Sequence, residues 1–296
     1  MNTSVAVIGL GLIGGSAARS LKAANGFKVY GDDRDAQTLS LALSECALDA
    51  ALTPALLSAC DMVMIALYPR ATVDWVRENA VYIRPGALVI DLCGVKREVC
   101  AGIAPIANER GFTFIGGHPM AGVARFGFLN SDKDMFKGAS MILTPEAPLE
   151  EELLCELRRV FGAMGFGFLK LPNPDEHDRM IAYTSQLAHV LSSAYAQSPA
   201  AERHIGFSAG SLKDMTRVAT LNVPMWAELF IENRDYLAEE VEALSARLDS
   251  YAKALRRGDT AEVARLLDMG CTAKQRMEEK EAAIHANGAH PGIQAL

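Results

Sequence analysis

The stretch that decides the fold is Val5-Ala-Val-Ile-Gly9-Leu-Gly11-Leu-Ile-Gly14-Gly-Ser16, near the start of the 296-residue chain. A short apolar run leads into the pattern G-x-G-x-x-G, and a helical pattern follows. Gly9 permits a tight turn, Gly11 lets the backbone approach a pyrophosphate, and Gly14 lets the helix pack closely on the strand. The helix N-terminus then offers free N–H groups to the phosphates. The expected cofactor-binding residues of this turn are Gly9, Gly11, Leu12, Ile13 and Gly14.

A second apolar run, Phe27–Tyr30, ends in Gly31-Asp32-Asp33-Arg34. Asp33 lies about 20 residues beyond the last glycine of the turn, where an acidic residue meets the ribose 2′-hydroxyl. A carboxylate there repels a 2′-phosphate, which favours NAD. Arg34 leaves NADP open, because a guanidinium attracts phosphate, although it can equally lie flat over the adenine. On the motif alone, a non-binding domain with a similar glycine turn remains an alternative.

Further apolar runs recur at regular intervals, separated by amphipathic stretches. Continuous runs of this length suit strands that are buried on both faces of a parallel sheet. The predicted strands are Val5–Ile8, Phe27–Tyr30, Met62–Leu67, Leu88–Leu92, Phe112–Ile115, Met141–Leu143 and Phe166–Leu171. They indicate an α/β, Rossmann-type domain with a mostly parallel sheet and helices on each side.

A break follows at Pro172-Asn173-Pro174-Asp175, because two prolines in three residues continue neither a strand nor a helix interior. We predict a nucleotide-binding domain over residues 1–171 and an all-helical domain over residues 172–296. Asp175 is the expected N-cap of a helix that runs to about Tyr195.

A last long helix is expected to begin at Asn222 and Pro224 and to end at Gly258. Its apolar positions alternate by four and three residues, which is the spacing of a bundle or coiled-coil seam. This seam consists of Leu237, Val241, Leu244, Leu248, Tyr251 and Leu255. Two interpretations remain open, packing within the chain and a subunit interface that makes a homodimer.

Composition limits the possible partners. With 29 Lys and Arg against 36 Asp and Glu, the net charge is −7, which argues against broad binding of nucleic acid or anionic membrane. We expect no transmembrane helix, since no window holds 18 uncharged apolar residues. The six cysteines form no Cys-x-x-Cys pair, so we expect a reduced, cytoplasmic protein without a zinc site.

Two histidines are candidate site residues. His118 lies in Gly116-Gly-His-Pro-Met-Ala-Gly122, after a predicted strand, where substrates of such sheets bind. It titrates near neutrality and can take a proton from a hydroxyl during hydride loss; a structural histidine is the alternative. On an ideal helix, Asp178, Ala182, Ser185 and His189 share one face. His189 is then a substrate ligand or a satisfied interhelical histidine.

Downstream, Gly206–Arg217 combines glycines, serines and one arginine. Arg217 suits a bidentate grip on a carboxylate, with a surface salt bridge as the equal alternative. Trp226 follows Pro224 in the first turn of a helix, a position that usually belongs to the core.

These segments together resemble the prephenate/arogenate dehydrogenase family of tyrosine biosynthesis. The resemblance spans about residues 4–270. It is carried by the glycine turn, by His-Pro-Met-Ala-Gly, by the Tyr183–His189 stretch, and by Gly210-Ser-Leu-Lys-Asp-Met-Thr-Arg-Val-Ala219 with Met225-Trp-Ala-Glu-Leu-Phe230. The histidine and Asp-Met-Thr-Arg segments are specific in combination.

The resemblance implies a Rossmann domain, a helical dimerisation domain and an NAD(P)-dependent oxidative decarboxylation of a cyclohexadienyl ring. It implies that His118 is the catalytic histidine that contacts the ring hydroxyl. His189 and Arg217 match positions that meet carboxylate or keto oxygens, and Gly210 and Trp226 match positions that line the pocket. We therefore expect prephenate as substrate and NAD as cofactor.

Two positions depart from the family pattern. Relatives often carry Asp-x-x-Ser-x-Lys, with the serine near the catalytic histidine, whereas Gly94 stands at the serine position of Asp91-Leu-Cys93-Gly94-Val-Lys96. We expect water, backbone or Cys93 to orient His118 instead. Relatives also often have a glutamate where Ala124 stands, so a gating carboxylate is missing.

Three other functions remain possible. Arogenate differs from prephenate only by an amine in place of the side-chain keto group; His189 suits the keto acid better. A β-hydroxyacid dehydrogenase would use a lysine as base, for which Lys213 is the candidate. An NAD-sensing module would bind NAD without turning over any cyclohexadienyl substrate.

Overall fold

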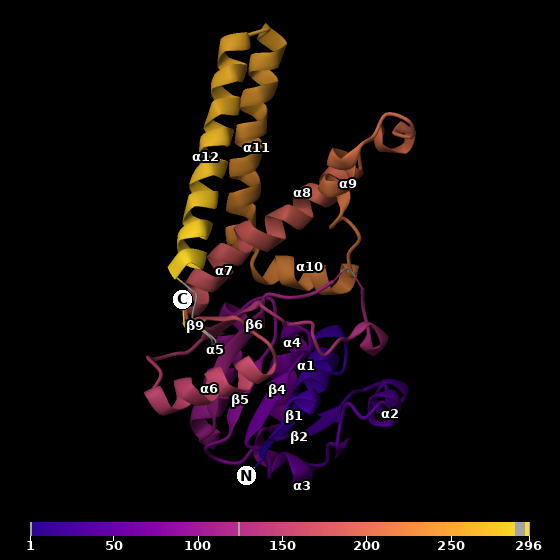
Figure 1. Cartoon of the computed structure of the whole chain (residues 1–296), viewed down its shortest axis with the longest axis vertical. Helices are drawn as coiled ribbons and strands as arrows, with labels where there is room; N and C mark the ends of the chain where they lie inside the picture. The colour runs from indigo at the N-terminus through magenta and orange to yellow at the C-terminus, as the bar shows by residue number, and fades with distance from the viewer. Residues whose placement is uncertain (1, 124, 288–293, 296) are drawn as a thin grey trace.

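The computed structural model describes residues 2–123, 125–287 and 294–295. These residues form one sheet at the base of the molecule and a group of helices above it (Figure 1). Among the described residues the strands are β1 (Thr3–Ile8), β2 (Phe27–Asp32), β3 (Ala50–Ala51), β4 (Met62–Ile65), β5 (Leu88–Asp91), β6 (Thr113–Pro119), β7 (Ser140–Thr144), β8 (Phe168–Lys170) and β9 (Gln294–Ala295).

The order of the strands is β3-β2-β1-β4-β5-β6-β7-β8-β9, and every pairing is parallel except that of β6 with β7. The prediction of a mostly parallel sheet followed by a helical region is confirmed. All seven predicted strands occur. β3 and β9 have two residues each, too few to show a pattern in the sequence.

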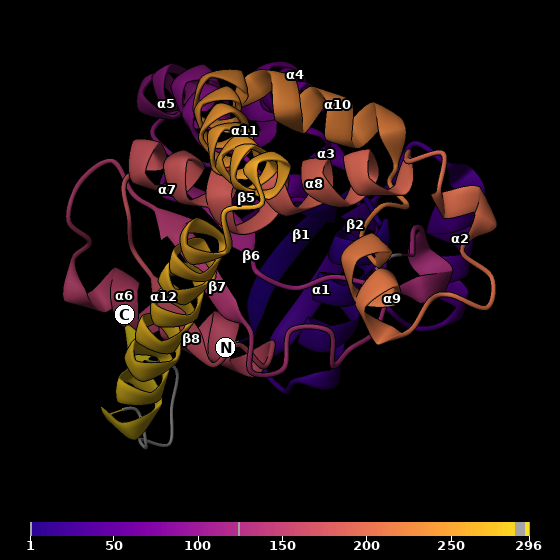
Figure 2. The same cartoon turned by 90° about the horizontal axis from the view of Figure 1, so that it is seen from above.

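Helices cover both faces of this sheet, as the view from above shows (Figure 2). Side chains of β1 alternate between the faces: Val5 and Val7 join one buried cluster, and Ala6 and Ile8 join another. The helices of this part are α1 (Leu12–Ala23), α2 (Ala36–Ser44), α3 (Pro54–Leu57), α4 (Pro69–Asn79), α5 (Arg97–Arg110) and α6 (Glu151–Ala163), with the short 3₁₀ turns η1 (Ala80–Tyr82) and η2 (Phe128–Asn130).

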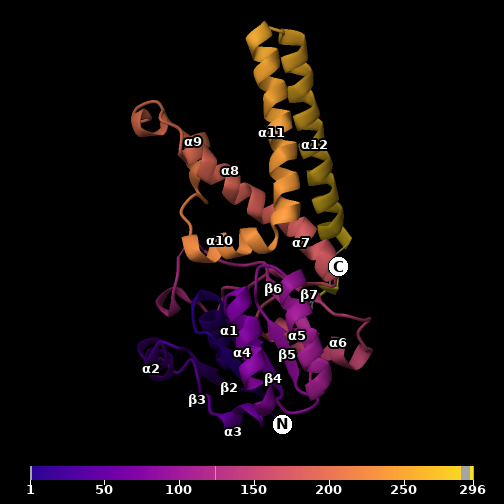
Figure 3. The ribbon, with the colours of Figure 1, turned by 180° about the vertical axis from the view of Figure 1, so that it is seen from behind.

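The second part of the chain is helical. α11 and α12 form a hairpin that stands away from the sheet, while α10 lies over the sheet (Figure 3). The elements are α7 (Pro174–Ile181), a π-helical segment η3 (Ala182–Gln186), α8 (Leu187–Ala196), the 3₁₀ turn η4 (Ala201–Arg203), α9 (Gly210–Thr216), α10 (Val223–Glu232), α11 (Arg234–Arg257) and α12 (Thr260–Asn287). In the part of the chain that the structure describes, no helix combines the length and apolarity needed to cross a membrane.

Two helix predictions were wrong in detail. The N-cap of α7 is Asn173 and not Asp175, because the Asn173 side chain accepts the N–H of Glu176 at 2.8 Å. The expected last helix is not continuous either. It breaks at the buried Asn233, whose amide donates to the backbone oxygen of Asp178 at 2.8 Å and to Gln186 at 2.7 Å. α12 follows it as a further helix after Gly258.

Candidate active site

The glycine turn between β1 and α1 has the shape that a dinucleotide needs. Gly9 has φ +82°, and a Cβ there would lie 2.7 Å from the backbone oxygen of Ala66. A Cβ on Gly14 would lie 1.8 Å from the oxygen of Gly9. At Gly11, by contrast, a Cβ would meet no atom within 4 Å. The chain therefore excludes side chains at two positions and leaves the third open to a ligand.

The first turn of α1 is available to an anion. Leu12 and Ile13 open this helix, and its N-cap, Gly11, has no side chain to occupy the free N–H groups. Asp33, directly after β2, is half-buried and accepts the N–H of Leu10 at 2.7 Å. These residues fit a dinucleotide. Arg34, next in the chain, is exposed.

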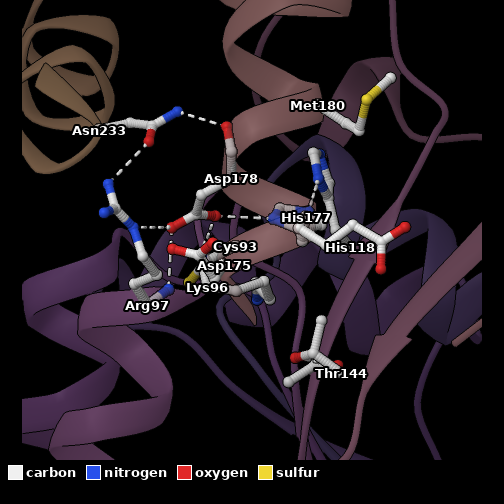
Figure 4. A network of polar contacts seen from close by, with 12 residues as sticks. Cys93, Lys96, Arg97, His118, Thr144, Asp175, His177, Asp178, Met180 and Asn233 are labelled. Carbon is white, nitrogen blue, oxygen red and sulfur yellow. Dashed lines mark hydrogen bonds and ion pairs between the residues drawn. The ribbon is translucent and has the colours of Figure 1, made fainter. Parts of the chain in front are cut away.

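His118 lies within β6, paired with Ile142 of β7, and is half-buried. Its Nδ1 lies 2.9 Å from Nε2 of His177, which α7 supplies from the helical part of the chain (Figure 4). The two rings meet edge to face, with centroids 5.1 Å apart. The sequence reasoning missed His177. Its only signal was a His-Asp pair next to the predicted boundary, which does not reveal a partner 59 residues away.

His177 is in turn held by its neighbour. Its Nδ1–H donates to Oδ1 of Asp178 over 2.7 Å. Asp178 also accepts the backbone N–H groups of Lys96 at 2.8 Å and Arg97 at 2.9 Å, at the start of α5, and the Arg97 side chain at 3.3 Å (Figure 4). This carboxylate therefore fastens α7 to the nucleotide-binding part.

The expected face from Asp178 to His189 assumed an ideal helix, and that assumption was wrong. The π-helical η3 lies between the two residues and changes the register. Asp178 instead serves His177 and α5, as above, and His189 belongs to a separate group of residues.

Burial, together with nearby charge, disfavours protonation of the two histidines. Lys96 is fully buried, contacts Asp91, and donates to the backbone oxygen of Gly117 at 2.6 Å. Burial, followed by the charges of His177 and Lys96, holds the pKa of His118 well below its usual range. Burial and Lys96 also lower the pKa of His177, although Asp178 acts in the opposite direction. Both rings are therefore neutral at neutral pH.

Gly94 lies on the side of the other nitrogen of His118, next to Leu229. A Cβ on Gly94 would lie 4.0 Å from Nε2 of His118 and 3.3 Å from a methyl carbon of Leu229 in α10. The expectation that water, backbone or Cys93 orients His118 was wrong for Cys93, whose sulfur lies 3.3 Å from the Thr72 hydroxyl. The contact to His118 comes from His177. Ala124, the other departure, lies outside the described residues.

A second group of predicted residues lies around α8 and α10. The rings of His189 and Trp226 stack with centroids 3.9 Å apart, and Nδ1 of His189 lies 3.0 Å from the backbone oxygen of Val218. Burial lowers the pKa of His189, and the nearby charge of Arg217 adds to this effect. Arg217 is exposed and forms no ion pair among the described residues. Trp226 is half-buried and is not a core residue.

α10 connects the two groups, because Trp226 and Leu229 lie one turn apart on it. Gly210, the first residue of α9, is less constrained: a Cβ there would meet no atom within 4 Å. The structure thus brings His189, Trp226 and Arg217 together. It pairs His118 with a residue that was not predicted.

Fold and site together define a nucleotide-binding oxidoreductase in which a helical second part covers the carboxyl edge of the sheet. Two family descriptions match the chain: "Prephenate dehydrogenase, nucleotide-binding domain" over residues 17–168 and "Prephenate dehydrogenase, dimerization domain" over residues 173–269. The chain belongs to the prephenate dehydrogenase family.

Individual relatives share about a quarter of their residues with this chain. The prephenate dehydrogenase of Lactococcus lactis is 27% identical over 95% of this chain and 79% of its own length. The cyclohexadienyl dehydrogenase of Zymomonas mobilis is 26% identical over 86% of this chain and 89% of its own. The structure is similar to that of prephenate dehydrogenase from A. aeolicus with hydroxyphenyl propionate and NAD+, with a TM-score of 0.79, 25% identity, and coverage of 94% and 98%.

Proposed function

We propose that this protein converts prephenate to 4-hydroxyphenylpyruvate and carbon dioxide, with transfer of a hydride to NAD, as a step of tyrosine biosynthesis. The observation that carries the proposal is the state of His118. It is half-buried, its Nδ1 is engaged by His177, burial holds its pKa well below its usual range, and its Nε2 lies on the side of Gly94, which has no side chain. A base of this kind suits removal of a proton from a ring hydroxyl.

NAD is the proposed cofactor, and when bound it accepts the hydride. Gly9, Gly11, Leu12, Ile13 and Gly14 would hold its pyrophosphate. Asp33 would accept a ribose hydroxyl, since its carboxylate faces the turn and already accepts the N–H of Leu10. The exposed Arg34 keeps NADP as the alternative.

His118 is the proposed catalytic residue. As the hydride leaves the ring carbon that bears the hydroxyl, the hydroxyl proton moves to Nε2 of His118. Carbon dioxide then leaves from the opposite ring carbon, and the electrons of the broken bond make the ring aromatic. His118 returns its proton to the phenolate oxygen, so the base is regenerated and no net proton is released.

Substrate binding is assigned to residues on the helical part. Arg217 would anchor a carboxylate of the dianion, because its guanidinium carries a permanent charge and has no carboxylate partner among the described residues. His189 would meet the keto acid. Trp226, stacked on His189, and Gly210 would line the pocket.

The remaining organisation is also proposed here. We place the boundary of the two domains at residues 171 and 172, between the end of β8 and the start of α7. The helical domain would join two copies of the chain into a homodimer. All six cysteines are free thiols, which suits a reducing cytoplasm.

The test is reduction of NAD by the purified protein, with prephenate and arogenate supplied separately. Turnover of prephenate alone is expected. Turnover of arogenate alone would keep the chemistry but replace the substrate. Tight NAD binding without turnover of either compound, with NAD or NADP, would overturn the proposal and favour a sensing module. A Lys213→Ala variant distinguishes the β-hydroxyacid dehydrogenase, for which that lysine is essential.

A further inference from the structure

We propose that His177 is the positioning residue for the base: Asp178, His177 and His118 form a relay that keeps the proton of neutral His118 on Nδ1 and leaves Nε2 free. This relay rests on the proposed function, because it concerns the same site. It makes a separate claim, however, about which atom carries a proton in the enzyme without substrate. That claim can be measured without any turnover.

The relay begins at Asp178, whose carboxylate can only accept. Four N–H groups already point at it, from the backbones of Lys96 and Arg97, the side chain of Arg97, and the ring of His177. These donors hold the pKa of Asp178 below its usual value despite burial. An ionised Asp178 requires His177 to carry its proton on Nδ1, the nitrogen that lies 2.7 Å away.

The second step concerns His177 and follows from its charge state. A neutral imidazole has one N–H, so a proton on Nδ1 leaves Nε2 as a lone pair. The charged groups around the ring are Asp178, Lys96 and Asp91, and with burial they leave the ring neutral. Nε2 of His177 must then accept, and the only nitrogen of His118 within reach, Nδ1 at 2.9 Å, must donate.

The third step concerns His118 and follows from the tautomer of His177. With the proton on Nδ1, its basic nitrogen is Nε2, beside Gly94. When Nε2 takes the proton of the substrate hydroxyl, the cation keeps its Nδ1–H bond to a neutral ring backed by a carboxylate. The orienting contact in this chain reaches Nδ1, the nitrogen on the side away from Gly94, and it comes from His177 in the helical part.

The first experiment reads the proton directly. Full-length protein with ¹⁵N-labelled histidine is examined by NMR in mildly alkaline buffer, without substrate, and the His118 signals are assigned from the His118→Asn spectrum. The relay predicts a protonated Nδ1 and an unprotonated Nε2 on His118. A proton on Nε2 of wild-type His118 would overturn the relay, whatever substrate the enzyme turns over.

The second experiment compares variants in turnover. His177→Phe keeps a ring but removes the acceptor, and we expect kcat to fall about 10²-fold or more with KM for prephenate little changed. His177→Gln offers an amide oxygen to His118 and should recover part of the loss. His204→Phe, at an exposed histidine bonded to Ser208, is the matched control and should match wild type.

A double variant separates positioning from folding. If His177 acts through His118, the variant His118→Asn/His177→Phe should be no slower than His118→Asn alone. Losses that multiply, or an unchanged kcat in His177→Phe, would overturn the relay. If His177→Phe does not fold, His177→Gln and the wild-type spectrum still decide it. Absence of prephenate turnover by the wild type would overturn the proposed function and leave the spectrum to decide the relay.

Discussion

At the scale of residues, the glycines of the nucleotide turn are not equivalent. Gly14 is required by the protein itself, since a Cβ there would overlap the backbone oxygen of Gly9 at 1.8 Å. Gly11 has open space around its Cα, so a methyl group there would clash only with a ligand that occupies this space. The two positions separate a requirement of the fold from a requirement of the cofactor.

This difference gives a paired prediction. Gly11→Ala should fold with unchanged melting temperature and bind NAD at least about tenfold more weakly, because the methyl group keeps the pyrophosphate from the backbone. Gly14→Ala should lower the melting temperature of the apoprotein, because the overlap forces β1 and α1 apart. Calorimetry with and without NAD measures both. Equal effects of the two variants on the apoprotein would contradict the distinction.

Arg217 supports a second prediction at this scale. Arg217→Gln removes the charge and keeps part of the hydrogen-bonding capacity, so KM for prephenate should rise by about 10–10²-fold while NAD affinity is retained. Steady-state kinetics and NAD titration measure the two quantities. Arg179→Gln, at an exposed pair with Glu239, is the control and should change neither. Loss of NAD affinity in Arg217→Gln would mean that this arginine serves the cofactor.

Residues differ in how far the sequence predicts their roles. The positions of the glycine turn and of His118 in the sheet were predictable, because local patterns surround them. His177 was not, because its role depends on a contact across 59 residues, and no local spacing encodes that contact. Similarly, Gly94 showed that a hydroxyl was missing, but only the fold shows that His177 contacts His118.

At the scale of elements, α10 lies over the nucleotide-binding part. Its Glu232 is largely buried, at 8% side-chain exposure, with Arg70 of α4 at 3.7 Å and with one oxygen that has no hydrogen-bond partner in the described part of the chain. Burial, followed by the charge of Glu228, raises the pKa of Glu232 to about 7. The ionised form of Glu232 therefore lowers the stability of the folded state, whereas the protonated form does not.

The sign of the resulting pH dependence is fixed by this shift. A raised pKa in the folded state means that stability falls as pH rises from the unfolded value of 4.5 through about 7. Glu232→Gln removes this penalty. The free energy of unfolding of the variant, relative to that of wild type, should therefore rise by about 1–3 kcal/mol when the pH is raised from about 5 to about 8. Denaturant unfolding at both pH values measures it. Glu239→Gln, at an exposed carboxylate, should show no such gain. A gain that is independent of pH would contradict the assignment.

Helix existence was more predictable than helix ends. Asn222 and Gly258 marked true boundaries, since the Asn222 side chain accepts the N–H of Met225 at 3.4 Å and Gly258 adopts the left-handed conformation with φ +62°. The break at Asn233 was hidden, because it arises from tertiary hydrogen bonds to Asp178 and Gln186. The π-helical η3 has no local signal of its own in this sequence.

At the scale of the whole molecule, the seam of α11 is only partly used within the chain. Leu237 is buried, but Leu248 is 54% and Leu255 is 65% exposed. Along α12, Leu267 and Met269 are exposed as well. Such a stripe on a helical hairpin that projects from the sheet suits contact with a second copy.

The double variant Leu248→Lys/Leu255→Lys should therefore be monomeric in sedimentation at concentrations where wild type is dimeric. Burial of each leucine is worth about 1.5–3 kcal/mol, so the dimer should weaken by at least about 10²-fold. Val81→Lys, at an exposed apolar residue of η1, is the control and should stay dimeric. A monomeric wild type would show that the seam has another partner.

The overall architecture was the most predictable level. Buried strands, amphipathic helices and the Pro172–Asp175 break each leave a local pattern, so the sheet and the helical region were correct. The way the helical part lies on the sheet left no such pattern. It depends on contacts such as that between Asp178 and the start of α5.

That contact has a consequence for the proposed base. His118 belongs to the sheet, whereas His177 and Asp178 belong to the helices, so the relay exists only while the two halves are seated together. Without the contact between the two parts, Nδ1 of His118 would lose its partner His177. The nucleotide turn is formed within the first part of the chain alone, whereas the proposed proton acceptor needs both parts.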